Sequence, residues 1–379
     1  MLNPAAQADS VAAAKSVVDP GVPSFASRVR GSLLGGALGD AFGYLVEFDD
    51  LASIRRQYGP IGLFDLSQAS GTAHFSDDTQ MTLYTVDGLT EVLEWARQGV
   101  AADPTACLWL AYLRWLATQG EQPDAGAPSP LPRWIDSQEV LRHRRHPGNA
   151  CLSGLRSAEM GSPSRPVNPN SKGCGTVMRS APFGLLPMLE PVETVQWTTM
   201  AAALTHGHPA AWQSSAAFAL LIRALSVETL PLSGALVTAI DYLHGQTIDA
   251  AVRERWDAAL QAADAGRPDQ GQSMDPEQLC NLLGEGWVAE EALAIAVYAV
   301  VVTRDAVDPV GHFLAAMRIA ANHRGDSDST ASIAGNILGA LYGEEALPWG
   351  WLQAAEAPDL IRTLADRFIE LADVNPSQE

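Results

Sequence analysis

Lysine is almost absent from this chain of 379 residues, where it occurs only at Lys15 and Lys172. Lysine and arginine together number 24 against 44 aspartates and glutamates, which gives a formal net charge of −20. This excess of negative charge argues against a protein that binds the phosphate backbone of nucleic acids in general. It does not exclude a small anionic ligand, because net charge does not describe the potential inside one cleft.

Cysteine and long hydrophobic runs are also scarce. The four cysteines show no CxxC pairing and lie far apart in the sequence, so we expect reduced thiols and a cytoplasmic protein. No run approaches the roughly 20 apolar residues of a membrane-spanning helix, so we expect no membrane partner. The opening segment, MLNPAAQADSVAAAKSVVDP, does not resemble a signal peptide because it lacks a basic stretch followed by a long apolar one.

Segments with the strict alternation of β-strands are rare, whereas apolar residues at helical spacing recur along the chain. Hydrophobic residues make up 47% of the sequence and charged residues 18%, which excludes a wholly disordered chain. We therefore predict a mainly α protein that follows a flexible arm over residues 1–24. The expected helices cover residues 25–47, 77–97, 104–118, 193–204, 209–227, 289–303, 310–321 and 358–372. The expected loops cover residues 119–132, 161–175 and 262–276.

The first predicted helix is rich in glycine, which costs about 1 kcal/mol per residue relative to alanine. Gly35, Gly36 and Gly39 lie within it. We expect these small residues to let a neighbouring helix approach closely.

Two acidic clusters stand far apart in the sequence, and an apolar helical pattern follows each. The first is HFSDDTQ at residues 74–80 and the second is GDSDST at residues 325–330. A serine or aspartate at a helix start is commonly an N-cap, which needs only one such residue. Each cluster supplies two carboxylates and additional hydroxyl groups. We interpret this surplus as a sign of ligand binding.

Adjacent carboxylates at helix starts suit hard cations, which prefer oxygen ligands. If the two clusters converge, their four aspartates carry the charge of two divalent cations, and leaving them unmatched would be costly or force protonation. The hypothesis is a two-metal site for Mg²⁺, with Mn²⁺ or Ca²⁺ as alternatives; Zn²⁺ fits less well because no cysteine or histidine pattern accompanies the clusters. The predicted ligands are Ser76, Asp77, Asp78, Asp326, Asp328 and Ser329.

DSDST also resembles the DxDxT motif of haloacid-dehalogenase-like phosphatases. That motif should end a buried strand near the start of a doubly wound fold, whereas here a helical segment, MRIAANHRG, precedes it. An EF-hand is excluded because glycine and glutamate are absent from the required offsets.

Five motifs in order, spanning about residues 26–343, resemble the ADP-ribosylglycohydrolase family. They are RGSLLGGALGDAFGYLVEF, FSDDTQMT, NSKGCGTVMRSAPFGLL, LTHGHP and NHRGDSDSTASIAGNILGALYG. The family includes the dinitrogenase-reductase-activating enzymes and the hydrolases of ADP-ribose-arginine and ADP-ribose-serine bonds. The resemblance implies a compact, single-domain, all-α fold, here over residues 25–379, with a binuclear metal centre at the base of a cleft.

The resemblance also assigns roles to individual residues. The six predicted ligands match the family's two metal-binding motifs, with Ser329 standing where threonine is common. Glu47 and Asp78 are the candidate catalytic residues: Glu47 as a metal ligand, a proton donor or an activator of water, and Asp78 as a residue that holds the metals. A glycine-rich loop resembles the family's phosphate-and-ribose loop, and a histidine near ADP-ribose follows it. The implied substrate contacts are Lys172, Gly173, Cys174, Gly175, Thr176, Met178 and His206.

The implied activity is the metal-dependent removal of ADP-ribose from a modified target, with an arginine-linked target favoured, by attack of water on the anomeric carbon of the ribose. Two alternatives stay open. The chain could act on small ADP-ribosyl compounds, or it could neutralise an ADP-ribosyltransferase toxin by docking onto it. The expected partners are therefore an ADP-ribosylated protein, an ADP-ribosyl small molecule, or a cognate ADP-ribosyltransferase.

Overall fold

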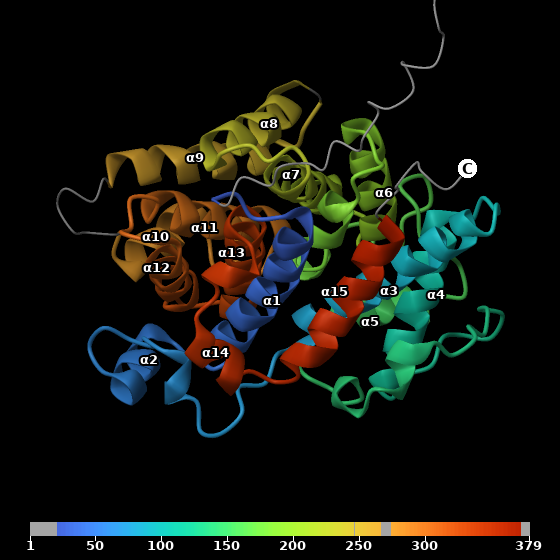
Figure 1. The fold of residues 1–379 in the computed structure, drawn as a ribbon, viewed down its shortest axis with the longest axis horizontal. Helices are drawn as coiled ribbons and strands as arrows, with labels where there is room; N and C mark the ends of the chain where they lie inside the picture. Colours follow the sequence, from blue (N-terminus) through green and yellow to red (C-terminus); the bar gives the residue numbers. More distant parts are fainter. Residues whose placement is uncertain (1–20, 246, 267–273, 373–379) are drawn as a thin grey trace, which may run out of the picture.

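A computed structural model describes residues 21–245, 247–266 and 274–372 of the chain (Figure 1). Within these ranges the chain forms helices and short 3-10 turns, with only isolated β-bridges and no strand. The predicted all-α fold is therefore confirmed. The α-helices are α1 Phe25–Gly43, α2 Leu51–Tyr58, α3 Asp77–Arg97, α4 Pro104–Thr118, α5 Asn149–Arg156, α6 Pro191–Ala203, α7 Pro209–Ser226, α8 Leu232–Gly245, α9 Ala250–Ala265, α10 Pro276–Leu283, α11 Ala289–Val302, α12 Pro309–Ala321, α13 Ser327–Tyr342, α14 Trp349–Ala354 and α15 Pro358–Ala372.

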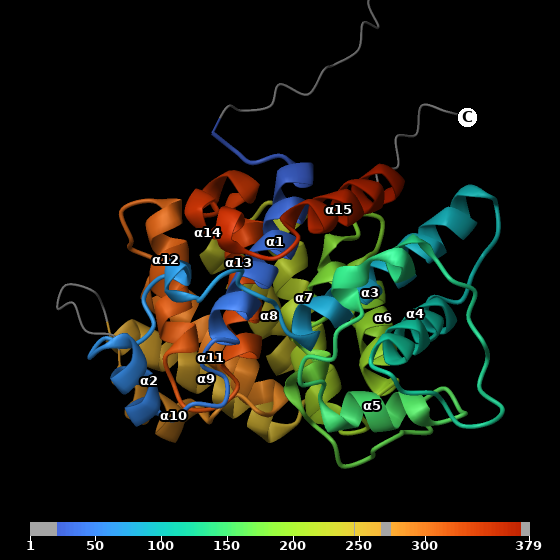
Figure 2. The ribbon, with the colours of Figure 1, turned by 90° about the horizontal axis from the view of Figure 1, so that it is seen from below.

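Helices α1 and α13 lie side by side at the centre of the molecule (Figures 1 and 2). Their backbones meet through glycines: a Cβ atom on Gly35 would lie 2.4 Å from the carbonyl oxygen of Gly335, and one on Gly43 would lie 2.1 Å from that of Ser327. Any larger side chain at these positions would push the two helices apart. The close approach predicted for the glycine-rich helix is thus observed, and it places the end of α1 beside the start of α13.

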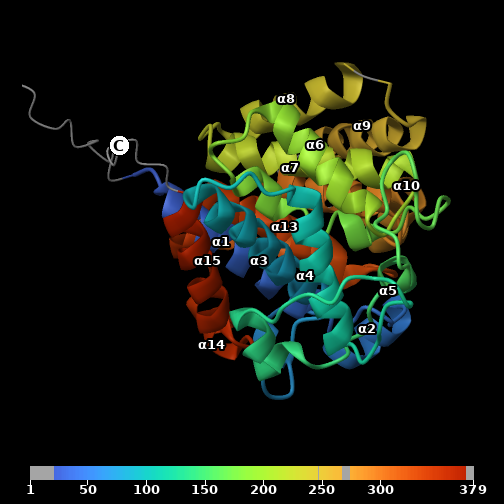
Figure 3. The ribbon, with the colours of Figure 1, turned by 90° about the vertical axis from the view of Figure 1, so that its right-hand side faces the viewer.

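The other helices enclose this pair. Helices α7, α11 and α12 pack against α13, while α15 and α3 pack against the opposite flank of α1 (Figure 2). Helix α4 covers α3, and α8 and α9 cover α7 and α11 (Figure 3). One hydrophobic cluster runs through these layers and includes the buried rings of Trp115 on α4 and Trp256 on α9. A rigid scaffold therefore holds the helix ends that carry the acidic clusters.

Most expected helices are present with ends within two residues of the prediction, and α3, α4 and α15 match it fully. The first helix is an exception, since α1 ends at Gly43 and the predicted extension to Glu47 is wrong. Residues 44–48 form turns instead, and the Tyr44 N–H bonds back to the Asp40 carbonyl oxygen. Glu47 therefore lies on a turn beyond the helix.

The loop expected at residues 262–276 is partly wrong, because α9 continues to Ala265 and α10 begins at Pro276. Residues 267–273 of that prediction lie outside the described residues, as do residues 1–20 of the predicted N-terminal arm. At the end of the arm, the Ser24 side chain caps α1 by accepting a hydrogen bond from the Ser27 N–H. Of the other two expected loops, residues 119–132 contain no helix, and residues 161–175 contain none before the 3-10 turn that begins at Cys174.

Candidate metal centre and substrate cleft

The two acidic clusters, far apart in the sequence, converge at the starts of α3 and α13. The side-chain hydroxyl of Ser329 donates a hydrogen bond to Asp78 Oδ2 over 2.8 Å, which joins the two helices directly. Both clusters are buried except for His74, which is exposed. The two clusters therefore meet in the structure, as the two-metal hypothesis requires.

A third helix fixes the first cluster in place. Asp40, buried on α1, accepts hydrogen bonds from the N–H of Ser76 at 2.8 Å and from the N–H of Thr79 at 2.9 Å. The Ser76 hydroxyl in turn accepts a bond from the Asp78 N–H at 3.2 Å and so acts as the N-cap of α3. Burial and the charge of Asp328 raise the pKa of Asp40 to about 7. Asp40 therefore holds the first acidic cluster against α1.

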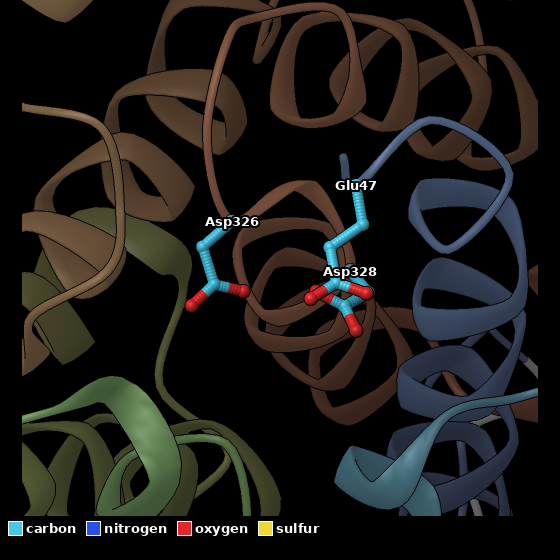
Figure 4. Close-up of side chains that lie close together, drawn as sticks. All are labelled: Glu47, Asp326 and Asp328. Carbon is cyan, nitrogen blue, oxygen red and sulfur yellow. The ribbon is translucent and has the colours of Figure 1, made fainter. Parts of the chain in front are cut away.

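Glu47 completes the acidic cluster from the turn after α1. One carboxylate oxygen from each of Glu47, Asp326 and Asp328 lies within 4.8 Å of the other two (Figure 4). Glu47 is only 7% exposed, and its Oε2 atom has no hydrogen-bond partner. A buried carboxylate oxygen without a partner is costly. It therefore indicates a group that binds in the cleft.

The pKa shifts of the clustered carboxyl groups also indicate that a ligand binds in the cleft. Burial raises the pKa of Glu47 to about 11, and the charges of Asp328 and Asp326 add to this effect. Burial and the nearby Asp328 also raise the pKa of Asp77, of Asp78 and of Asp326 well above the usual range. Among the described residues, no arginine, lysine or histidine forms an ion pair with any of these five carboxylates. Divalent cations are the counter-charges that such oxygen ligands fit.

The cluster lies in a cavity of about 210 Å³. Of the predicted substrate residues, five line it: Gly173, Cys174, Gly175, Met178 and His206. Other lining residues include Glu47, Asp77, Asp78, His146, Asn149, Cys151, Trp287, Asp326, Asp328 and Ser329. A second cavity, of about 530 Å³, shares Asn149 and Ala150 with this cleft. A further cavity, of about 550 Å³, lies away from the cluster, beside the loop that follows α4.

Two predicted substrate residues lie beside the cleft without lining it. The Lys172 ammonium forms an ion pair with the buried carboxylate of Glu290, so its charge is matched within the protein. Thr176 is fully buried, and its hydroxyl donates a hydrogen bond to the Ala211 carbonyl oxygen at 3.3 Å. In this structure both residues support the loop from behind.

The glycine-rich loop is fixed by its neighbours. The Cys174 N–H bonds to the Trp287 carbonyl oxygen at 3.2 Å, and the Ala289 N–H bonds to that of Lys172 at 2.8 Å. Behind the loop, Arg179 is buried, donates a hydrogen bond to the Thr205 hydroxyl at 2.7 Å and lies over the Tyr112 ring. Arg179 therefore ties together the helices behind the loop and does not line the cavity.

His206 lies at the wall of the cleft as a neutral side chain. Its Nδ1 atom shares a hydrogen bond of 2.8 Å with the Thr205 hydroxyl, and burial lowers its pKa to about 3. The nearby His208 caps α7 by accepting a bond from the Ala210 N–H. His323 contacts the Thr330 hydroxyl behind the second acidic cluster, whereas His74 pairs with Glu356 at the surface.

Aromatic side chains at the mouth of the cleft were not predicted as a group. Phe48 and Trp287 are 63% and 43% exposed, and their ring planes are 23° apart with centroids separated by 6.5 Å. The ring of His146 lies edge-on to Phe48 and shares a hydrogen bond of 2.8 Å with the Tyr44 hydroxyl. Phe48 shows no distinctive pattern in the sequence, because it is a single apolar residue next to a glutamate.

The fold and the site define a class of protein. It is a helical protein in which the ends of the central helices form a buried carboxylate cluster able to hold metal ions. A glycine-rich loop lines the cleft at this cluster, and aromatic side chains lie at the entrance of the cleft. The ADP-ribosylglycohydrolase model matches residues 22–378. The chain belongs to the ADP-ribosylglycohydrolase family, and it is an ADP-ribosyl glycohydrolase, a hydrolase of the glycosidic bond to ADP-ribose.

Several relatives match along nearly their whole length. The ADP-ribosyl-[dinitrogen reductase] glycohydrolase of Rhodospirillum rubrum is 25% identical over 362 residues, covering 93% of this chain and 99% of the relative. The ADP-ribosylhydrolase ARH3 of Danio rerio is 24% identical, with coverages of 91% and 90%. A solved structure, an ADP-ribosylglycohydrolase-related protein complex, superimposes with a TM-score of 0.59 at 23% identity, covering 92% of this chain and 99% of that one. The predicted family, fold class and enzymatic nature are confirmed. No described helix is long and apolar enough to cross a membrane.

Proposed function

We propose that this enzyme removes ADP-ribose from a modified target in a metal-dependent reaction, by attack of water on the anomeric carbon of the ribose, and that it favours an arginine-linked target. One observation carries the proposal. The unpartnered Oε2 atom of buried Glu47 lies among aspartates that line the same cleft. Such a site supplies both ligands for cations and a carboxyl group that can exchange a proton.

The residues that would hold the cations are those at the two helix starts. The four aspartates match the charge of two divalent cations, of which Mg²⁺ is favoured and Mn²⁺ or Ca²⁺ are alternatives. Bound cations would supply Lewis-acid chemistry that stabilises charge in the transition state. The proposed ligands are Ser76, Asp77, Asp78, Asp326, Asp328 and Ser329.

The protein's own groups then have distinct tasks. Glu47 comes from a turn and has a free oxygen, so it is the residue we assign to proton transfer, either from the attacking water or to the leaving group. The Asp78 carboxylate accepts a hydrogen bond from the Ser329 hydroxyl, which orients this carboxylate toward the cleft. Asp78 thus acts by positioning the reacting groups, and Glu47 by moving the proton.

We propose that the rest of ADP-ribose follows the glycine-rich loop, with Lys172, Gly173, Cys174, Gly175, Thr176, Met178 and His206 as the surrounding residues. Glycines in such a loop let the backbone approach a diphosphate. The neighbouring cavity of about 530 Å³ gives the ligand room beyond the ribose, and Arg144 and Arg156 line it. Both arginines form ion pairs with Glu121, so one negative charge offsets part of their positive charge.

The preference for arginine rests on the mouth of the cleft. A guanidinium group is planar and cationic, and it binds well against aromatic faces. Phe48 and Trp287 present two such faces at the entrance, next to Glu47. A serine-linked target offers these rings no comparable group. The target itself is proposed to be an ADP-ribosylated protein, and the cytoplasm stays the predicted location.

The test measures ADP-ribose release from arginine-modified and serine-modified protein, each with Mg²⁺ and with EDTA. We expect release with Mg²⁺ from the arginine-modified protein only. The variant Asp326→Ala should lose turnover and keep its fold. Asp359→Ala, which removes an exposed aspartate from the first turn of α15, is the matched control and should keep full activity.

Two outcomes would overturn parts of this proposal. Release that continues in EDTA, or full activity of Asp326→Ala, would contradict the metal-dependent reaction. Release from neither modified protein would favour the two alternatives, which are hydrolysis of small ADP-ribosyl compounds and docking onto a transferase.

A further inference from the structure

The thiol of Cys174 lies among the candidate metal ligands. It donates a hydrogen bond to Asp326 Oδ2, with the Sγ and Oδ2 atoms 2.6 Å apart, and it also interacts with Ser329 and Asp78. Asp326 is one of the three carboxylates whose oxygens lie within 4.8 Å of one another. The thiol is therefore in direct contact with the centre of the acidic cluster.

The backbone fixes the position of this thiol. Cys174 begins a 3-10 turn that ends at Thr176, and its N–H is bonded to the Trp287 carbonyl oxygen. Its side chain lines the same cavity as Glu47. The buried, unpartnered Oε2 atom of Glu47 is an independent sign that a ligand belongs in this cavity. A sulfur donor thus faces the same space as the free carboxylate oxygen.

We propose that Cys174 is a metal ligand, and that this enzyme's centre therefore accepts thiophilic divalent cations such as Cd²⁺, Co²⁺ and Zn²⁺ alongside hard ones. The inference rests on the metal centre of the proposed function. When such a cation binds, the S–H bond breaks, a sulfur–metal bond forms and the proton passes to solvent. Soft thiolate ligands favour these cations over Mg²⁺, which prefers oxygen.

A second thiol in the cleft provides a control. Cys151 also lines the cavity, but its sulfur lies 3.5 Å from Arg179 Nη1 and 3.9 Å from the Gly175 carbonyl oxygen. The guanidinium charge beside it disfavours a cation there. Replacing Cys151 therefore removes a cleft thiol without removing the one that contacts the carboxylates.

The test is a titration of the full chain with Co²⁺, followed by the near-ultraviolet charge-transfer band of a cobalt–thiolate bond. We expect the band in the wild type and in Cys151→Ser, and its loss in Cys174→Ser. Calorimetry should show Cd²⁺ affinity reduced at least about tenfold in Cys174→Ser, while Mg²⁺ affinity is retained.

Other outcomes overturn the proposal in distinguishable ways. Mg²⁺-dependent release of ADP-ribose without a cobalt–thiolate band, or a band that persists in Cys174→Ser, contradicts the role of Cys174 and leaves the proposed function standing. No binding of any divalent cation to the wild type contradicts both. If Cys174→Ser fails to fold, alkylation of the wild type decides: Cd²⁺ should protect Cys174 from iodoacetamide, and equal labelling with and without Cd²⁺ overturns the proposal.

Discussion

Glu47 differs from the aspartates of the cleft in its origin. Those aspartates stand at helix starts, where backbone N–H groups and neighbouring hydroxyls fix them, whereas Glu47 lies on the turn that follows α1. Its Oε2 atom lacks a partner. A side chain on a turn, with a free oxygen, is better suited to exchange a proton than to hold the framework of a metal site.

We therefore predict that Glu47→Gln lowers kcat for ADP-ribose release by about 10²- to 10⁴-fold, the range expected for loss of general acid–base catalysis. The melting temperature should stay the same or rise, because glutamine has the same shape and the variant removes a buried carboxyl group whose Oε2 atom has no partner. Steady-state kinetics and thermal unfolding measure the two effects.

The control is Glu159→Gln, since the Glu159 side chain is exposed and does not line the cavity. This variant should match the wild type in both measurements. A kcat for Glu47→Gln close to the wild-type value would exclude Glu47 from proton transfer.

At the residue scale, the sequence predicted the acidic cluster but not the full lining of the cleft. Surplus carboxylates at two helix starts are visible without any structure. The pairing of Lys172 with Glu290 is not, because it joins residues 118 positions apart and depends on how α11 packs. The aromatic mouth is similarly hidden, since Phe48 and Trp287 meet only in the folded chain.

At the scale of the elements, the contact between α1 and α13 controls the site. We predict that Gly335→Ala lowers the free energy of unfolding by about 1–3 kcal/mol or more, because its Cβ would lie 2.0 Å from the Gly35 carbonyl oxygen. The gain in helix propensity, about 1 kcal/mol, is too small to offset the clash. Denaturant unfolding measures the change.

Gly350→Ala is the matched control, because no atom lies within 4 Å of its added Cβ on α14. It should leave stability unchanged or slightly increased. If both variants were equally stable, the close approach of α1 and α13 would not limit the size of the residue at Gly335.

Helix boundaries show how far sequence patterns reach. The start of α3 was predictable because Ser76 is a good N-cap, and the start of α4 because Asp103 caps it ahead of Pro104. The end of α1 was not, because the apolar pattern continues beyond Gly43 into the turns of residues 44–48. Short helices such as α2 and α5 were missed since eight residues carry little periodicity.

At the scale of the whole molecule, cation binding should be linked to folding. Unpaired carboxylates buried at the junction of α1, α3 and α13 oppose the folded state, and divalent cations bound only to that state stabilise it. We predict that Mg²⁺ at one hundred times its dissociation constant raises the free energy of unfolding by about 2.7 kcal/mol, and that EDTA removes the gain.

Thermal unfolding with and without Mg²⁺ measures this effect, and Asp328→Asn should show little of it. Stabilisation of that variant equal to the wild type would mean that Mg²⁺ acts elsewhere on the chain.

The close pairing of α1 with α13 also has a consequence for synthesis. Glu47 and the first acidic cluster leave the ribosome early, whereas Asp326 and Asp328 emerge only after nearly 250 further residues, between Asp78 and Asp326. Until then the glycine face of α1 has no partner, and the centre has half of its aspartates. The complete site therefore forms late and in one step, when α13 packs against α1. A nascent chain cannot hydrolyse its substrate before its own fold is nearly finished.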